Sequence, residues 1–166
     1  MESQREKIEQ LQNLALYALE NLRASNQPVL QICGPISSGG FGSVKENIEY
    51  LQSVIYEVQR AGFSVFDQLE YERDLDWIMG PSTDDDHMIL EYFYDPILRS
   101  GYISGLVFVP LWETSVGCLW ENKLGMSLNL PILYLSSLLV SDVNEFVQRY
   151  VKTVESKPSN LERVLE

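Results

Sequence analysis

Short apolar runs alternate with helical segments through most of this chain of 166 residues. From the apolar runs we predict strands at 28–33, 63–66, 106–111 and 131–135. Helices are predicted at 44–61, 84–98, 115–129 and 140–154. Strands that alternate with helices form a parallel sheet covered by helices on both faces, with right-handed connections. The alternation therefore predicts an α/β fold.

The predicted architecture is a flavodoxin-like or Rossmann-like three-layer sandwich with a parallel sheet of four or five strands. Four such strands most often take the order 2-1-3-4, which reverses direction between the first and third strands. Ligands bind at that point, beyond the carboxyl ends of the strands. The loops at 34–43 and 112–117 meet there, so we expect them to form the site.

The length fits a single domain over 1–166. A helical extension at 1–26 precedes the first strand, and a polar tail at 156–166 follows the last helix. The extension carries a helical stripe formed by Ile8, Leu11, Ala15, Ala18 and Leu22. This stripe could serve as a contact with a second copy of the chain.

The charge and the apolar runs exclude several kinds of partner. Only 12 basic residues oppose 24 acidic ones, which argues against binding to nucleic acid or to an anionic membrane. No apolar run approaches the roughly 18–20 residues that span a bilayer, and no signal peptide is evident, so a cytoplasmic protein is expected.

Few residues are suited to hold a metal or a cofactor, and we expect neither. Cys33 and Cys118 each lie in an apolar segment and are predicted to be buried free thiols. The only histidine, His87, lies in a polar segment and is predicted to be a solvated helix residue. Zinc chemistry and a Ser-His or Cys-His triad are therefore disfavoured.

The first loop, GPISSGGFGS at 34–43, has four glycines and three serines but no lysine, so it is not a Walker A loop. Its backbone N–H groups and hydroxyls could receive an anion at the start of the next helix. The alternative is a plain turn.

The second loop leads into a helix on which Gly117, Glu121 and Gly125 lie four residues apart and so share one face. Glycines within a helix each cost about 1 kcal/mol relative to alanine, so their presence needs a reason. One interpretation is space for a ligand that approaches the Glu121 carboxylate, with Ser115 at the helix N-terminus facing an anion. The other is an N-cap serine, a surface glutamate and glycines that allow tight helix packing.

These residues carry a resemblance to a known family. Trp112-Glu-Thr-Ser-Val-Gly117 followed by Glu121 resembles the W-E-x-S-x-G-x-x-x-E signature of the nucleoside 2-deoxyribosyltransferase-like superfamily. The likeness is closest to its small uncharacterised members and to the 2′-deoxynucleoside 5′-phosphate N-hydrolases. The stretch CGPISSGG at 33–40 is similar to their C-G-S-I-R-G-G phosphate loop, and the likeness spans roughly 29–135.

The resemblance implies a mechanism. Glu121 would attack the anomeric carbon of a 2-deoxyribose, release the base and form a glycosyl-enzyme, while Asp95 would act on the departing base. The position of Ser115 implies a nucleoside monophosphate in preference to a free nucleoside. The implied substrate-binding residues are Gly34, Ser37, Ser38, Gly39, Gly40, Trp112, Ser115 and Gly117. The family likeness also implies a homodimer or a higher homo-oligomer.

Two alternatives stay open. The arginine of the phosphate loop is absent, with Ser37 or Ser38 in its place, which leaves room for a nucleotide-binding module without turnover. A structural homo-oligomer of the same fold is the third interpretation.

After the second strand, Asp67, Asp74, Asp76 and Trp77 could line a sugar pocket or belong to a solvated acidic loop.

Overall fold

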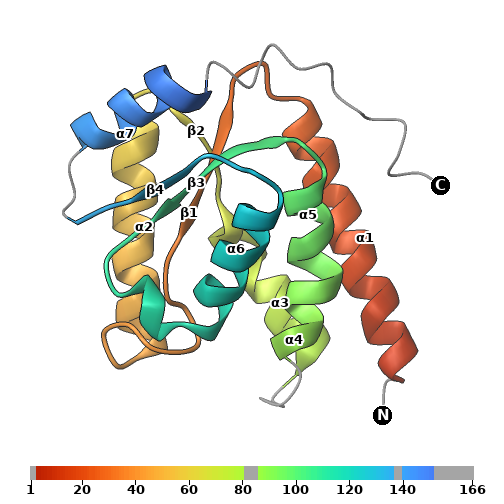
Figure 1. Cartoon of the computed structure of the whole chain (residues 1–166). Helices are drawn as coiled ribbons and strands as arrows, with labels where there is room; N and C mark the ends of the chain where they lie inside the picture. Colours follow the sequence, from red (N-terminus) through yellow and green to blue (C-terminus); the bar gives the residue numbers. More distant parts are fainter. Residues whose placement is uncertain (1–2, 81–85, 137–139, 152–166) are drawn as a thin grey trace.

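Among the residues that the computed structural model describes (3–80, 86–136 and 140–151), the sheet has four parallel strands in the order β2-β1-β3-β4. The strands are β1 (Val29–Cys33), β2 (Ser64–Phe66), β3 (Ile103–Phe108) and β4 (Ile132–Tyr134). The predicted α/β fold and strand order are confirmed. The carboxyl ends of β1 and β3 lie at the lower end of Figure 1, close to the start of α6 (Val116–Ser127).

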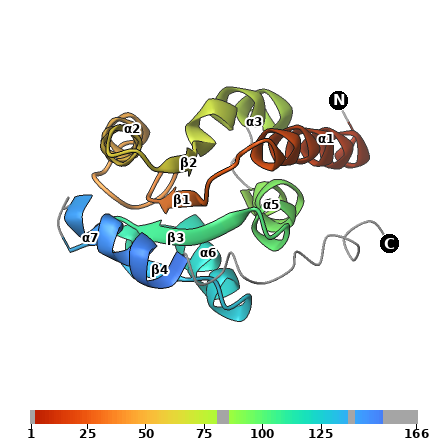
Figure 2. The same ribbon diagram turned by 90° about the horizontal axis from the view of Figure 1, so that it is seen from above.

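Helices cover both faces of the sheet (Figure 2). One face is covered by α2 (Val44–Arg60) and α7 (Val140–Phe146), which continues as a π-helical turn, η4 (Val147–Val151). The other face is covered by α1 (Gln4–Arg23), α3 (Glu72–Met79), α5 (Asp95–Arg99) and α6. The structure is therefore the three-layer sandwich expected from the sequence.

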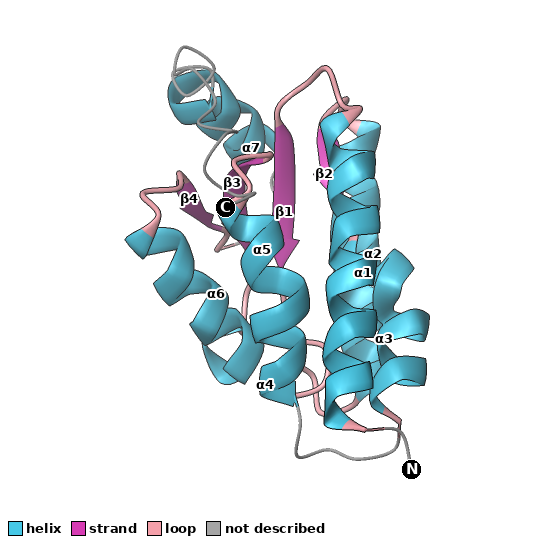
Figure 3. Ribbon diagram, turned by 90° about the vertical axis from the view of Figure 1, so that its right-hand side faces the viewer, coloured by secondary structure: helices cyan, strands magenta, loops and turns pink. Residues whose placement is uncertain are grey.

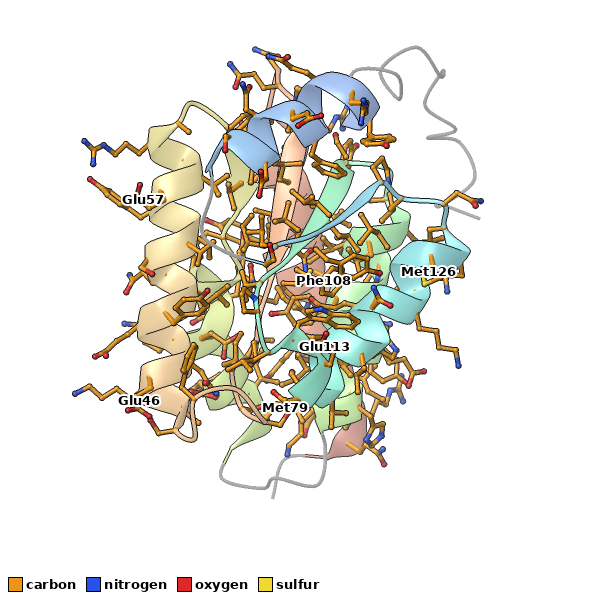
Figure 4. The ribbon with its side chains drawn as sticks, turned by 60° about the vertical axis from the view of Figure 1, so that its left-hand side comes forward. Glu46, Glu57, Met79, Phe108, Glu113 and Met126 are labelled. Atoms are coloured by element: carbon orange, nitrogen blue, oxygen red, sulfur yellow. The ribbon has the colours of Figure 1, made fainter. Side chains whose placement is uncertain are left out.

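The two faces of the sheet contribute to two separate apolar clusters. Side chains alternate between the faces along a strand, so Leu30 and Ile32 pack toward α2 and α7, while Val29 and Cys33 pack toward the other layer. The same alternation in β3 sends Val107 to the first cluster. Side chains on the outer side of α2, such as Glu46 and Glu57, point into solvent, whereas Phe108 lies in the middle of the molecule (Figure 4).

The N-terminal helix α1 is part of this sandwich. Its stripe of Leu11, Ala15, Ala18 and Leu22 is buried, and the helix packs against α3, α5 and the π-helical turn η2 (Leu90–Tyr94) (Figure 3). The suggestion that this stripe contacts a second copy is therefore wrong, because the same chain already covers it.

The segment predicted as one helix at 84–98 contains three consecutive helical pieces within its described part. They are α4 (Asp86–Ile89), η2 and α5. The π-helical turn η2 inserts extra backbone and buries Phe93 and Tyr94. Turns of this kind inside helices occur frequently at functional sites. Residues 84 and 85 of the predicted helix lie outside the described residues.

Two further elements differ from the prediction. The acidic segment after β2 is helical, with a 3₁₀ turn η1 (Gln68–Tyr71) followed by α3, and the Asp67 side chain accepts a hydrogen bond from Leu69 N at 3.0 Å at its start. Strand β3 begins at Ile103, three residues before the predicted start. Gly105 lies within the strand, and a glycine suits this position because a Cβ there would lie 3.1 Å from the Phe146 ring. No described helix is long and apolar enough to cross a membrane.

Candidate functional site at the ends of the strands

A cavity of about 150 Å³ lies beyond the carboxyl ends of β1 and β3. Its wall is formed by the loop after β1, by η1, α3 and η2, and by the first turns of α6. This is the position that the strand order predicts for a ligand site. The volume is below the roughly 300–1,000 Å³ of sites that enclose a drug-sized ligand, so it suits one ring with further groups outside.

Glu121 is the buried carboxylate of this cavity. It belongs to α6, is 7% exposed and accepts a hydrogen bond of 2.6 Å at Oε1 from Nε2 of Gln31. Gln31 lies on β1 and faces α6, because the alternation of the strand turns Leu30 and Ile32 the other way. The amide therefore fixes the orientation of the carboxylate.

Burial raises the pKa of Glu121 to about 7, and hydrogen bonds from Cys33, Gln31 and Cys118 act against this rise. Both cysteines are buried free thiols, as predicted. Burial raises their own pKa values, and the charge of Glu121 adds to the effect. The thiols therefore stay protonated and act as weak donors to the carboxylate.

Tyr94, from η2, completes the surroundings of the carboxylate. Burial raises its pKa well above the usual value, and the charges of Glu72 and Glu121 raise it further. The phenol therefore lies near both carboxylates and is neutral at physiological pH.

The two glycines beside Glu121 have different roles. A Cβ on Gly117 would come no closer than 3.8 Å to Ser115 Oγ, and Gly117 lines the cavity. A Cβ on Gly125 would lie 2.5 Å from Leu106 Cδ1, so this glycine lets α6 approach β3 closely. The open face predicted on both sides of Glu121 is therefore open on one side only, and tight helix packing explains the other.

Ser115 lies at the N-terminus of α6, as predicted, but its hydroxyl already has a partner. Its Oγ accepts from Cys118 N at 3.3 Å, and Ser38 Oγ accepts from Val116 N at 3.1 Å. Ser38 thereby joins the loop after β1 to the start of α6. Two of the helix N–H groups that could hold an anion are bonded within the protein.

Gly34, Ser37 and Ser38 line the cavity, whereas Gly39 and Gly40 are not part of its wall. Both of the latter have positive φ, and Gly40 N donates to Thr114 Oγ1 at 2.7 Å. A Cβ on Gly39 would collide with the Thr114 carbonyl group. These two glycines are therefore needed for the contact between the two loops.

Asn47 anchors the loop after β1 and was not recognised in the sequence. Its Nδ2 donates to the carbonyl oxygens of Ile36 and Gly39, both at 3.0 Å, and its Oδ1 accepts from Phe41 N at 2.8 Å. The available signal was an amide on the buried face of an amphipathic helix.

The structure does not bring Asp95 and Trp112 to the cavity. The Asp95 carboxylate accepts from Arg99 Nε at 2.8 and 3.0 Å. Asp95 follows Tyr94 by one residue, so the helix turns it by about 100° away from the cavity side. Trp112 packs on Phe108 and Tyr134, with ring centroids 5.0 and 5.3 Å apart.

The carboxylates that do line the cavity with Glu121 are Glu72 and Asp76, one turn apart on α3. Asp76 is one of the residues that the sequence offers for a sugar pocket, whereas Glu72 lies on α3, which the sequence pattern does not predict. Asp67 caps η1, Asp74 and Trp77 are exposed, and His87 is solvent-exposed as predicted. Figure 4 labels Met79, at the end of α3, and Glu113, just before α6, and both lie in the lower half of the molecule in that view.

The charged side chains in the wall of the cavity are all acidic. Among the described residues that line it there are three carboxylates and no lysine or arginine. The described residues contain no group of three or more side chains arranged to hold a metal ion. Gln68 also lines the cavity, and its Oε1 is buried without a hydrogen-bond partner.

No protein-family model matches this chain, and no curated protein or solved structure is significantly similar to it.

Proposed function

We propose that this protein cleaves or transfers the N-glycosidic bond of a deoxynucleoside or its 5′-monophosphate, with Glu121 as the nucleophile. The proposal depends mainly on one observation, which is the buried Glu121 carboxylate that Gln31 holds at a ring-sized cavity. Burying a carboxylate lowers the stability of the folded protein, and among the described residues of the wall there is no cation to compensate for this loss. Such perturbed groups in clefts are typical of functional sites.

The chemistry begins with an ionised Glu121. One of its oxygens attacks C1′ of the sugar, the C1′–N bond breaks, and its electron pair leaves with the base, which takes up a proton. Water or a second base then attacks C1′ and releases Glu121. Since burial raises the pKa of Glu121 to about 7, about half of it is ionised in the free protein at neutral pH.

Glu72 is proposed as the group that assists the departing base. The family likeness gave this role to Asp95, which is paired with Arg99 outside the cavity. Glu72 lines the cavity, and its charge acts on Tyr94 together with that of Glu121. A carboxyl group at this position can donate a proton to the base or orient it.

The surroundings of the cavity favour a neutral deoxynucleoside over the monophosphate. Three carboxylates line it, and the net charge of the chain is -12. The Ser38 and Ser115 hydroxyls and two N–H groups of α6 are bonded to one another. A phosphate placed here would meet negative charge and two helix N–H groups that already donate within the protein.

A role in assembly is the second candidate. Val116, Leu119 and Met126 form an apolar line along α6 and are 68%, 48% and 63% exposed, and Val116 also lines the cavity. A helix that is apolar on both sides usually packs on both sides. This line favours a homodimer or a higher homo-oligomer, with or without turnover.

The test is an assay of free base. The protein is incubated with the four common 2′-deoxynucleosides and their 5′-monophosphates, and the products are separated by chromatography. We expect release from at least one deoxynucleoside and a loss of about 10³-fold or more in Glu121→Gln, whose amide cannot attack C1′. Glu113→Gln is the matched control, because Glu113 is exposed and lies outside the cavity wall.

Two other outcomes of these experiments would favour the alternative functions. Binding of a nucleotide without release would favour the non-catalytic module. Neither binding nor release, with a stable oligomer in solution, would favour the assembly role.

A further inference from the structure

Gln68 is a buried amide of which only one end is bonded. It is 2% exposed, belongs to η1 directly after β2, and lines the cavity that contains Glu121. Its Nε2 donates to the carbonyl oxygen of Ile32 at 2.7 Å. Its Oε1 is buried and has no hydrogen-bond partner among the described residues.

The Ile32 carbonyl group fixes which end of the amide is free. Exchanging the two ends would place Oε1 against another acceptor at 2.7 Å, so the donor must face Ile32. The free end is therefore an acceptor. A buried acceptor without a partner is destabilising, and native proteins rarely leave one unless a water or a ligand satisfies it.

We propose that Gln68 Oε1 accepts a hydrogen bond from a sugar hydroxyl of the bound nucleoside and thereby selects ligands that carry this hydroxyl. This inference rests on the proposed function. The shared chemistry is a hydrogen-bond donor, which a sugar hydroxyl or a base amino group can supply. The cavity has room for one ring beside Glu121, and the ring that Glu121 attacks is the sugar, so we assign the donor to the sugar.

The expected consequence is a strong preference. A site with a buried acceptor rejects a ligand that lacks the matching donor, because the acceptor then stays unpaired in the complex. Removal of the right hydroxyl should therefore weaken binding by about tenfold or more. Without the acceptor, the same change in the ligand should have little effect.

The test measures binding with a set of four ligands. The full-length chain carrying Glu121→Gln is titrated by calorimetry, so that the ligand is not consumed. The ligands are 2′-deoxyadenosine, 2′,3′-dideoxyadenosine, 2′,5′-dideoxyadenosine and purine 2′-deoxyriboside, which lacks the amino group. We expect one missing hydroxyl to weaken binding by about tenfold or more. After Gln68→Met is added, the same missing hydroxyl should weaken binding by less than about twofold.

Two further variants make the result interpretable. Gln68→Lys keeps a donor for Ile32 and removes the acceptor, so it replaces Gln68→Met if that chain does not fold. Gln52→Met is the control, because Gln52 is exposed on α2 and should leave the preference unchanged.

An undiminished hydroxyl preference in the Gln68 variants would overturn the inference, as would a Gln68-dependent preference for the base amino group. Base release by the unmodified protein together with such a result would leave the proposed function standing. A Gln68-dependent hydroxyl preference without any base release would support the inference and remove the enzymatic proposal. Binding of none of the four ligands would overturn the inference, and if the unmodified protein also releases no base from any of the deoxynucleosides, the proposed function is overturned as well.

Discussion

The two faces of β1 have the same backbone and different chemistry. Leu30 and Ile32 on one face belong to the apolar cluster beneath α2 and α7. Gln31 on the other face is just as deeply buried, yet it bonds to the Glu121 carboxylate. Neighbouring residues of one strand therefore belong to an apolar core and to a polar site.

The distribution of the buried polar side chains shows the same contrast. Gln68, Ser115 and Glu121 line the cavity, Gln31 bonds to Glu121, and Asn47 ties down the loop beside it. On the side of the sheet covered by α2 and α7, the buried polar side chain among the described residues is the Asn47 amide in the first turn of α2, and the rest of that cluster is apolar. The polar groups on the other face therefore add a cost to folding that a function would justify.

Exchanging the chemistry of the two faces should give the largest effect on stability. Ile32→Gln places an amide without partners in the apolar cluster and should lower the free energy of unfolding by about 3–4 kcal/mol. Gln31→Leu should cost at most about 1–2 kcal/mol, because it removes one hydrogen bond together with an amide oxygen that has no partner. Urea unfolding at pH 6 measures both, and equal losses would contradict the proposed difference between the faces.

The pH dependence of stability should reveal the cost of Glu121. Its ordinary pKa of 4.5 is raised to about 7 in the folded protein, so between these values the folded state keeps a proton that the unfolded state has lost. The intact protein should therefore lose about 3 kcal/mol of stability relative to Glu121→Gln as the pH rises from 4.5 to 7.

Urea unfolding of both proteins at several pH values measures this difference in stability. The other titrating groups are present in both proteins, so their contributions largely cancel. Glu113→Gln, which changes an exposed carboxylate outside the cavity wall, is the control. A constant difference between the intact protein and Glu121→Gln would show that the pKa of Glu121 is not raised.

The two glycines of α6, Gly117 and Gly125, should respond differently to substitution by alanine. Gly125→Ala should lower the free energy of unfolding by about 1–3 kcal/mol, because its Cβ meets Leu106. Gly117→Ala should leave stability unchanged or raise it by up to about 1 kcal/mol, while its methyl group narrows the cavity and weakens nucleoside binding. Thermal unfolding and calorimetry check the pair. A loss of stability in Gly117→Ala would contradict the distinction between the two glycines.

Most of the fold could be predicted from the sequence, because the signals are local and repeated. Short apolar runs separated by helical periodicity give the strand order and both helical layers. The positions of Glu121 and Ser115 followed from the same pattern, since the helix after the third strand must begin at the switch point. The start of β3 was missed because Gly105 weakens a strand pattern unless its packing partner, Phe146, is known.

The opposite wall of the cavity could not be predicted in the same way. The acidic segment that forms η1 and α3 has few apolar residues, and its helix is stabilised by packing of Leu75, Ile78 and Met79 in the core. The family likeness implies Asp95 by its position along the chain, and the π-helical turn before it changes which residues face the cavity. Gln68 has no sequence signal, because a buried unpaired acceptor is visible only in three dimensions.

The most direct test of the central claim is the detection of a covalent adduct on Glu121. The protein is mixed with the 2′-deoxynucleoside that it cleaves, quenched in acid during turnover, digested and analysed by mass spectrometry. We predict that the peptide containing Glu121 carries the added mass of a 2-deoxyribosyl group, and that this mass is absent from Glu121→Gln. Base release without any adduct, or an adduct on another residue, would contradict the assignment of Glu121 as the nucleophile.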